Sequence, residues 1–223
     1  MVTSFFILTI LSSLFDNCKF LGVYLDENLS WSVHINKISN KISKTIGVIS
    51  RIRYKFDSTT LLMLYNTMVL PYLNYCCIVW GANYFGRLER LIKLQKRMIR
   101  IITGLKKRDH TSQIFKNLNV LKINEINVLK TSLLMYKLYN GLLLEKFSSF
   151  LCLNNDLHQH YTRSHNNFHL ISVKTNIRKF SLKFRGSVIW NTIHEIYRFA
   201  TSISSFKKLV KDCLINGYFD IIT

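Results

Sequence analysis

Acidic residues are scarce in this sequence, and their spacing excludes one class of catalytic site. Only 12 of the 223 residues are aspartate or glutamate, against 31 lysines and arginines. No two aspartates are adjacent or separated by a single residue. Two-metal phosphoryl-transfer sites need clustered carboxylates to hold Mg²⁺, so no such site can be read here. The adjacent pair Asp26 and Glu27 is interpreted as a turn, and we predict no catalytic residue.

Cysteine pairs of the kind that bind zinc are absent. The five cysteines are an odd number, and no two of them have the C-x-x-C spacing. This pattern disfavours a disulfide framework and a zinc ribbon, and it indicates reduced thiols inside a cell. We therefore expect an intracellular protein, nuclear or cytoplasmic. Cys76 and Cys77 stand in an apolar segment and are interpreted as core packing.

Motifs for metals, nucleotides and nucleophilic catalysis are also missing. His158, His160, His165 and His169 gather in one polar loop, but no Cys pair, suitably spaced carboxylate or H-E-x-x-H helix accompanies them. The sequence contains no G-x-S-x-G elbow and no Walker loop, and Gly81 to Gly86 reads as a turn. We predict no metal and no cofactor in this chain.

The apolar run at the N-terminus, Phe5 to Phe15, resembles a short signal-peptide core. It has no basic region before it, and it is too short to span a membrane. We interpret residues 1–17 as an apolar leader, for which a reading frame opened at a chance methionine is favoured over a cleaved signal. Secretion is not expected.

The residues that are abundant are hydrophobic and basic ones. A hydrophobic content of 48% with 13% aromatics is enough to bury a core in one large or two small domains. The formal charge of +19 exceeds what solubility requires and is the electrostatic signature of a nucleic-acid binder. Nucleic acid is favoured over a membrane surface as the partner.

The segment from Ser58 to Gly104 is predicted to form two helical halves that pack as a hairpin. Its first half, Leu61 to Trp80, has no charged residue and contains the only proline, Pro71. We predict a kinked, buried helix capped by Ser58. Twenty uncharged residues have the length of a membrane span, but two asparagines and the proline disfavour that interpretation.

The second half, Arg87 to Leu105, is strongly amphipathic. At 100° per residue one side is apolar and the other is basic. The predicted nucleic-acid-binding residues on this basic side are Arg87, Arg90, Lys93, Lys96, Arg97 and Arg100. Glu89 is the only acidic residue between Arg87 and Arg108, so few ion pairs explain the positive charge. A self-repelling face of this kind indicates an anionic partner, and phosphate backbone or an anionic membrane surface would fit.

The segment before this hairpin predicts a strand and a helix. Cys18 to Leu25 is rich in apolar and aromatic residues and is predicted to be a strand, followed by a polar turn. From Trp31 to Ile52, apolar residues recur every three or four positions, which predicts a helix capped by Ser30. This helix carries a second candidate strip for nucleic acid: Lys37, Lys41 and Lys44.

The C-terminal half is predicted to be mixed in structure. Asp109 to Ser112 should cap a short helix that ends near Leu118, and Asn124 to Asn140 should form a helix that stops at Gly141. The remaining predictions are a polar loop at Cys152 to Asn167 that marks an internal boundary, strands at His169 to Lys174 and Lys179 to Phe184, and helices at Trp190 to Phe199 and Ser202 to Leu214.

Short motifs occur along nearly all of the chain after residue 18. They are Lys19-Phe20-Leu21-Gly22-Val23, Leu29-Ser30-Trp31, His34-Ile35, Leu64-Tyr65, Leu70-Pro71-Tyr72-Leu73, Val79-Trp80-Gly81, Leu94-Gln95-Lys96-Arg97, Ile99-Arg100-Ile101-Ile102, Arg108-Asp109-His110-Thr111, Met135-Tyr136-Lys137, Tyr161-Thr162-Arg163, Phe180-Ser181 and Trp190-Asn191. Each motif is weak alone, but in this order they resemble the tail of a reverse transcriptase from a jockey-like, LINE-type non-LTR retrotransposon.

The resemblance implies an arrangement of domains. Residues 18–28 would be the last strand of the palm, 29–108 a thumb-like helical bundle, 109–151 a helical C-terminal region and 152–223 a loop with short strands and closing helices. The expected fold class is mainly α, with a short β segment at the start and a small β element near residues 169–184. The family often has proline where this chain has Leu144 and His194, which fits divergence or a decaying copy.

The resemblance also implies functions for particular residues. Lys19, Phe20, Leu21 and Gly22 match the segment that helps to place the primer end. The aromatic-x-Asp-Asp motif of the palm, which would bind Mg²⁺ and polymerise, is expected before residue 1 and is missing. The sequence therefore predicts a reverse-transcriptase fragment that binds the phosphates of an RNA or RNA–DNA template–primer duplex but is no enzyme alone. The alternatives are a basic membrane-surface or protein-interaction protein, and a non-functional remnant.

Overall fold

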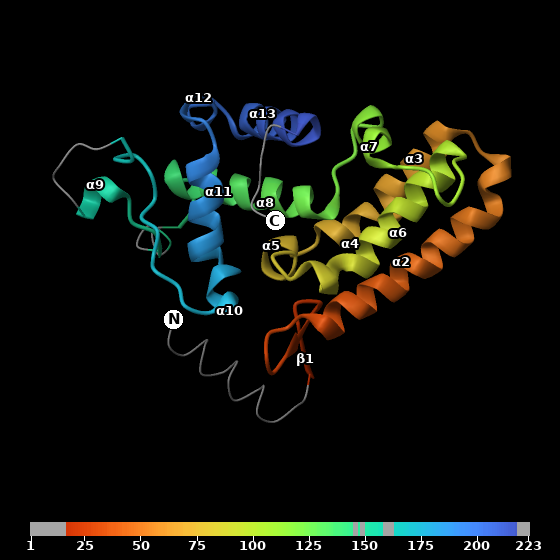
Figure 1. The fold of residues 1–223 in the computed structure, drawn as a ribbon, viewed down its shortest axis with the longest axis horizontal. Coiled ribbons are helices and arrows are strands. Elements are labelled where there is room, and N and C mark those ends of the chain that lie inside the picture. The colour runs from red at the N-terminus through yellow and green to blue at the C-terminus, as the bar shows by residue number, and fades with distance from the viewer. Residues whose placement is uncertain (1–16, 145–146, 148–149, 158–162, 218–223) are drawn as a thin grey trace. The chain divides into compact units, whose positions relative to one another are not determined.

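The computed structural model describes residues 17–144, 147, 150–157 and 163–217 of the chain (Figure 1). The described residues form two compact units. The first unit holds the described residues up to Cys76 together with Asn83–Ile114, and the second holds Cys77–Ala82 and the described residues from Phe115 onward. Residues 1–16 of the predicted leader and two of the four loop histidines, His158 and His160, lie outside the described residues. The fold is mainly helical with a short two-stranded sheet near its start, which confirms the predicted mainly α fold with a short β segment at the start.

The first unit begins with a β-hairpin and continues with helices. Its elements are β1 (Asn17–Phe20), β2 (Val23–Asp26), α2 (Ser32–Ile52), the 3-10 turn η1 (Arg53–Lys55), α3 (Ser58–Met68), α4 (Leu70–Asn74) and α6 (Phe85–Thr103). The strands are antiparallel, and Phe20 pairs with Val23 across the turn. The single predicted strand at Cys18 to Leu25 is therefore wrong. Leu21 and Gly22, with φ of 44° and 81°, reverse the chain in its middle.

Three helices of the first unit, α2, α3 and α6, pack together around a shared core (Figure 1). The predicted period of α2 is confirmed, because its isoleucines are buried at every third or fourth position. Tyr65 of α3 and Gln95 of α6 meet inside this core, where the Gln95 amide donates a hydrogen bond of 2.8 Å to the Tyr65 hydroxyl. Burial raises the pKa of Tyr65 to about 12. The expected packing between the two halves of the hairpin is confirmed by α3 and α6.

The first half of that hairpin is not one kinked helix. The segment from Leu61 to Trp80 contains the rest of α3, then α4, and then α5 (Cys77–Trp80). Pro71 lies in the first turn of α4, where its missing N–H costs nothing, and α3 ends before it at Met68. Tyr75 is extended and Cys76 has a φ of 48°, so the chain breaks again before α5. Burial is confined to one side, and of the two cysteines Cys77 is buried whereas Cys76 is half-buried.

The two predicted N-terminal caps are also corrected. The N-cap of α3 is Asp57, whose carboxylate accepts a hydrogen bond from the Thr60 N–H, and Ser58 is the first helical residue. The N-cap of α2 is Trp31, without a side-chain cap. The carboxylate of Asp26 instead accepts hydrogen bonds from Ser30 and from the Trp31 N–H at 2.8 Å. The side chain that secures the start of α2 therefore comes from the end of β2.

The second unit is built around one helix that is buried on most sides, α8 (Ile123–Tyr139). Its other elements are α5, α9 (Asn154–Leu157), α10 (Asn176–Lys179), the π-helix η3 (Leu182–Gly186), α11 (Ser187–Thr192), α12 (Glu195–Arg198) and α13 (Ile203–Asn216), and α7 (Ser112–Asn117) crosses the division between the units. Contacts from α5, η3, α11 and α13 cover α8. An aromatic cluster fills this core, with Tyr136 stacked on Phe206 at 4.5 Å between ring centroids.

The short helix after Ser112, the helix from Asn124 and the last helix are confirmed as α7, α8 and α13. The strands predicted at His169 to Lys174 and Lys179 to Phe184 are wrong. Residues 169–174 have no regular secondary structure, and the second stretch runs from the end of α10 into the π-helix η3. The predicted helix at Trp190 to Phe199 is divided into α11 and α12 by the extended residue Ile193. The domain bounds expected from the sequence stay a prediction.

Candidate nucleic-acid interface

The basic residues of α6 project from a helix whose apolar side is buried. Leu88, Leu91, Met98, Ile99 and Ile102 are at most 3% exposed. Of the predicted contact residues, Arg87, Arg90, Lys93, Lys96 and Arg97 are exposed, and Arg100 is half-buried. The αL residue Gly104 ends the helix, with its N–H bonded to the Arg100 carbonyl. The predicted division of this helix into an apolar and a basic side is confirmed.

Two of these arginines reach across to the N-terminal half of α2. The Arg87 guanidinium donates a hydrogen bond of 2.9 Å to the Ser30 carbonyl, and the Arg90 guanidinium donates one of 2.7 Å to the Asn40 side chain. Asn83, just before α6, also donates to the Ser30 carbonyl, at 3.0 Å. These contacts pair the start of α6 with the start of α2, so the two helices run in the same direction.

The remaining basic residues of α6 differ in their surroundings. Lys93 forms an exposed ion pair with Glu89 at 2.8 Å, which contributes little to stability. The Arg100 guanidinium donates two hydrogen bonds, of 3.2 and 3.0 Å, to the Asp109 carbonyl, so it also secures the loop after α6. Lys96 and Arg97 are solvent-exposed. Arg97 follows Arg90 by seven residues, so it lies two turns further along the same side.

The second predicted strip follows the exposed side of α2. Lys37, Lys41 and Lys44 are exposed and recur at intervals of four and three residues, which aligns them along the helix. Asn40 is next to Lys41 in the sequence of α2 and joins the two strips through its hydrogen bond with Arg90. Together α2 and α6 hold ten basic residues and one acidic residue, Glu89. The structure therefore brings both predicted strips onto one pair of adjacent helices.

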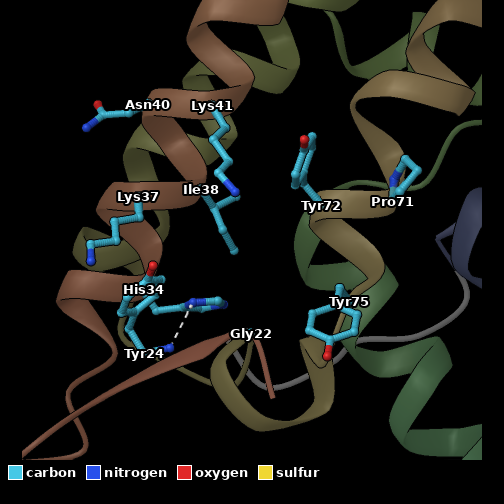
Figure 2. Close-up of a pocket in the computed structure, with 10 residues that line it drawn as sticks. All are labelled: Gly22, Tyr24, His34, Lys37, Ile38, Asn40, Lys41, Pro71, Tyr72 and Tyr75. Atoms are coloured by element: carbon cyan, nitrogen blue, oxygen red, sulfur yellow. Dashed lines mark hydrogen bonds between the residues drawn. The ribbon is translucent and has the colours of Figure 1, made fainter. Parts of the chain in front are cut away.

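A groove of about 470 Å³ opens between α2 and α4, with the β-hairpin at one end (Figure 2). The residues that line it are Gly22, Tyr24, His34, Lys37, Ile38, Asn40, Lys41, Pro71, Tyr72 and Tyr75. In Figure 2, His34 and Lys41 point from α2 into the groove, and Tyr72 and Tyr75 face them from the other wall. Lys37 points to the outer side of α2, where its ammonium lies 3.4 Å from the centroid of the Tyr24 ring.

The predicted primer-placing segment forms the tip of the hairpin beside this groove. Gly22 lines the groove, and Phe20 and Leu21 are exposed. Lys19 lies over the Tyr24 ring, with its ammonium 5.8 Å from the centroid. The Tyr75 hydroxyl donates a hydrogen bond to the Leu21 carbonyl, and a Cβ at Gly22 would lie 3.4 Å from the Tyr75 ring. Glycine therefore suits the positive φ at this turn, which packs against the Tyr75 ring.

The three groove tyrosines were not among the predicted site residues. Tyr72 occurs within the Leu70 to Leu73 motif, and the apolar segment that contains Tyr72 and Tyr75 was interpreted as one buried helix. Tyr72 and Tyr75 are instead 38% and 51% exposed. Their clustering with Tyr24 depends on the turn at Leu21 and the break after α4, and neither feature has a periodic signal in the sequence.

Two titratable groups at or beside the groove, His34 and Asp26, have pKa values below their ordinary ones. Burial, followed by the charge of Lys41, lowers the pKa of His34 below its ordinary value, which favours the neutral imidazole. The Nδ1 atom of His34 accepts a hydrogen bond of 3.4 Å from the Tyr24 N–H. Burial alone would raise the pKa of Asp26, but hydrogen bonds from Ser30 and Trp31 outweigh it and keep that pKa below its ordinary value. The ten residues that line the groove include two lysines and no carboxylate.

Within the part of the chain that the structure describes, no cluster of three or more histidine, cysteine or acidic side chains could hold a metal ion. His165 and His169 belong to this part. None of the helices in these described residues combines the length and the hydropathy that a membrane span requires.

Comparisons with known proteins relate part of the chain to a polymerase. Over 114 residues the chain is 28% identical to the "Probable RNA-directed DNA polymerase from transposon X-element" of Drosophila melanogaster. The match covers 49% of this chain and 12% of that protein, so the chain spans a small fraction of the relative's length. No protein-family model matches the chain. No solved structure matches it either. The similarity supports a region related to a reverse transcriptase.

Proposed function

We propose that this chain is a fragment of a non-LTR retrotransposon reverse transcriptase, of the jockey-like LINE type, that binds the backbone of an RNA or RNA–DNA template–primer duplex. The partial similarity to a transposon RNA-directed DNA polymerase supports the polymerase origin. In this proposal α2, α3, α4 and α6 serve as a thumb. Polymerisation and its Mg²⁺ ions belong to the catalytic part of the palm, which these 223 residues do not contain, so in this proposal the isolated chain is not an enzyme.

The observation that supports backbone binding best is the joined basic surface of α2 and α6. Ten basic residues share these two helices with a single acidic one, and Arg90 connects the strips through Asn40. Lysines and arginines that neutralise phosphates release condensed counterions, which favours binding without regard to sequence. The apolar side of α6 is used in the core of the first unit, so the basic side is the one available to a partner.

The test is charge reversal on the α6 side, with binding followed by fluorescence anisotropy. Arg90→Glu combined with Arg97→Glu should weaken binding of an RNA–DNA duplex by a similar factor for different sequences. Because each phosphate contact contributes about 0.9 to the salt slope, the slope of log affinity against log salt should flatten by roughly two. The probes should be duplexes of equal length and unrelated sequence.

The matched control reverses two exposed lysines of α13, Lys207→Glu with Lys208→Glu, and so makes the same change in net charge elsewhere. The proposal expects this control to keep most of the affinity and nearly the full salt slope. Equal losses in both double variants would mean that only net charge matters, and unchanged binding in the α6 variant would remove the assignment. Circular dichroism should establish that both variants are folded.

A further inference from the structure

The groove between α2 and α4 has the size and the wall chemistry of a small-molecule site. Its volume of about 470 Å³ lies within the range of about 300–1,000 Å³ that is usual for such sites. One wall presents the exposed rings of Tyr72 and Tyr75, and the opposite wall presents Ile38, His34 and Lys41 (Figure 2). The Lys41 ammonium lies 5.6 Å from the centroid of the Tyr72 ring. An aromatic face therefore stands next to a positive charge.

These features select a particular kind of occupant. Aromatic rings bind the flat faces of nucleobases, and lysines bind the phosphates that connect them. The groove is continuous with the basic surface of α6, because its lining residue Asn40 accepts the hydrogen bond from Arg90. A paired base hides both faces in its stack, so only an unpaired nucleotide can offer a face to a tyrosine.

The aromatic wall is held in place before any ligand binds. The Tyr75 hydroxyl donates a hydrogen bond to the Leu21 carbonyl, and the ring packs beside Gly22. Pro71 fixes the backbone of the first turn of α4 immediately before Tyr72. Preorganised side chains lose less conformational entropy on binding, which favours a specific site over a chance opening between helices.

We propose that this groove holds one unpaired nucleotide of the strand that lies on the α2–α6 surface, with its base against Tyr72 or Tyr75 and its phosphate near Lys41. This inference rests on the proposed function and specifies its substrate: a duplex with an unpaired extension is preferred to a blunt one. The contacts are to the ring and the phosphate, so the preference does not depend on which base is unpaired.

The experiment compares three probes on the full chain by fluorescence anisotropy: a blunt RNA–DNA duplex, the same duplex with a short unpaired extension, and the duplex with an abasic extension. The abasic probe keeps the phosphates and removes the base. We expect the natural extension to bind about tenfold more tightly than the abasic one, which is the scale of a single base–aromatic stack. Equal affinity for the two extensions would overturn the proposal.

Variants locate the effect in the groove. Tyr72→Ala and Tyr75→Ala should each reduce the preference for the natural extension, and the double variant should abolish it, with blunt-duplex affinity unchanged. Tyr72→Phe retains the ring and should retain the preference, which also answers the concern that an alanine variant has lost its fold. Tyr75→Phe retains the ring but loses its hydrogen bond to the Leu21 carbonyl, so it should retain more of the preference than Tyr75→Ala. Tyr54→Ala removes a tyrosine in η1 that is 81% exposed and does not line the groove, and it should behave as the wild type.

The same measurements separate this inference from the proposed function. If the natural extension is preferred but the blunt duplex does not bind, the groove is upheld and backbone binding by α6 is refuted. If the blunt duplex binds and the preference survives the double tyrosine variant, the groove proposal is refuted and backbone binding stands. If no probe binds, both proposals are refuted.

Discussion

Gly81 is required in the second unit because of crowding and not because of its backbone angle. A Cβ at this position would lie 2.6 Å from the Cys77 carbonyl oxygen, 2.7 Å from Cys77 Sγ and 3.0 Å from the Asn127 amide nitrogen. That amide donates a buried hydrogen bond of 2.8 Å to the same carbonyl. An added methyl group would therefore disturb the contact between α5 and α8 at its centre.

Gly81→Ala should lower the free energy of unfolding by about 1–3 kcal/mol, the usual cost of overpacking. Gly47→Ala is the matched control. Gly47 lies inside α2, and a Cβ there would meet nothing within 4 Å. This second change should stabilise the chain by about 0.5–1 kcal/mol, because alanine loses less backbone entropy than glycine in a helix. Thermal unfolding followed by circular dichroism checks both, and shifts of the same sign would contradict the argument.

At the scale of elements, the long amphipathic helices were predictable and the breaks between helices were not. α2 and α6 each bury one side in the first unit, so the apolar residues of each recur in the sequence with the period of a helix. Cys76, with its φ of 48°, has no such signal. The region of η3 has the alternation of a strand, but Ser181 caps a helical turn there, and a Cβ on Gly186 would lie 2.7 Å from Met135 Sδ. Packing against α8 therefore overrides the local pattern.

His34 links two elements and should make their attachment sensitive to pH. Its Nδ1 atom accepts the hydrogen bond from Tyr24 in β2, and a protonated imidazole cannot accept it. Burial and the charge of Lys41 lower the pKa of His34 below its ordinary value of 6.5. As pH falls, the unfolded chain takes up this proton first. The stabilising contribution is therefore complete above about pH 6.5 and is lost as the pH falls through the folded-state pKa.

We expect the midpoint of thermal unfolding to decrease between about pH 7 and pH 5, and we expect His34→Gln to make this decrease smaller. His110→Gln, which changes an exposed histidine, is the control and should follow the wild type. The midpoint is measured by circular dichroism at constant ionic strength. If His34→Gln and the wild type decrease in parallel, His34 is not the group responsible.

At the scale of the whole molecule, the sequence predicts the positive charge and the basic residues of the candidate site. The basic residues of α6 and α2 follow from helical period alone. Their joining through Arg90 and Asn40 depends on the parallel packing of two helices that are separated by three others in sequence. The groove depends in addition on the hairpin turn and on α4. Sequence reasoning therefore found the charges but missed Tyr24, Tyr72 and Tyr75.

The packing of α6 also bears on whether the net charge of +19 serves nucleic acid or a membrane surface. A helix that lies in a membrane interface buries its apolar side in lipid. In this chain Leu88, Leu91 and Met98 are buried in the first unit, so such binding would require part of its core to open. Attraction to an anionic membrane is then limited to the exposed charges, and such attraction is screened by salt within a Debye length of about 8 Å at physiological ionic strength.

We therefore expect the chain to sediment with phosphatidylserine vesicles at low salt, to be released as salt increases, and to be displaced by competing RNA. Neutral phosphatidylcholine vesicles are the control for apolar binding, and the chain should not sediment with them. RNA should win the competition because the aligned arginines and lysines of α2 and α6 match a fixed line of phosphates, whereas lipid headgroups offer only a diffuse charge. Sedimentation that persists at high salt and in excess RNA would instead identify a membrane-surface protein, whose α6 helix would have to leave the core of the first unit.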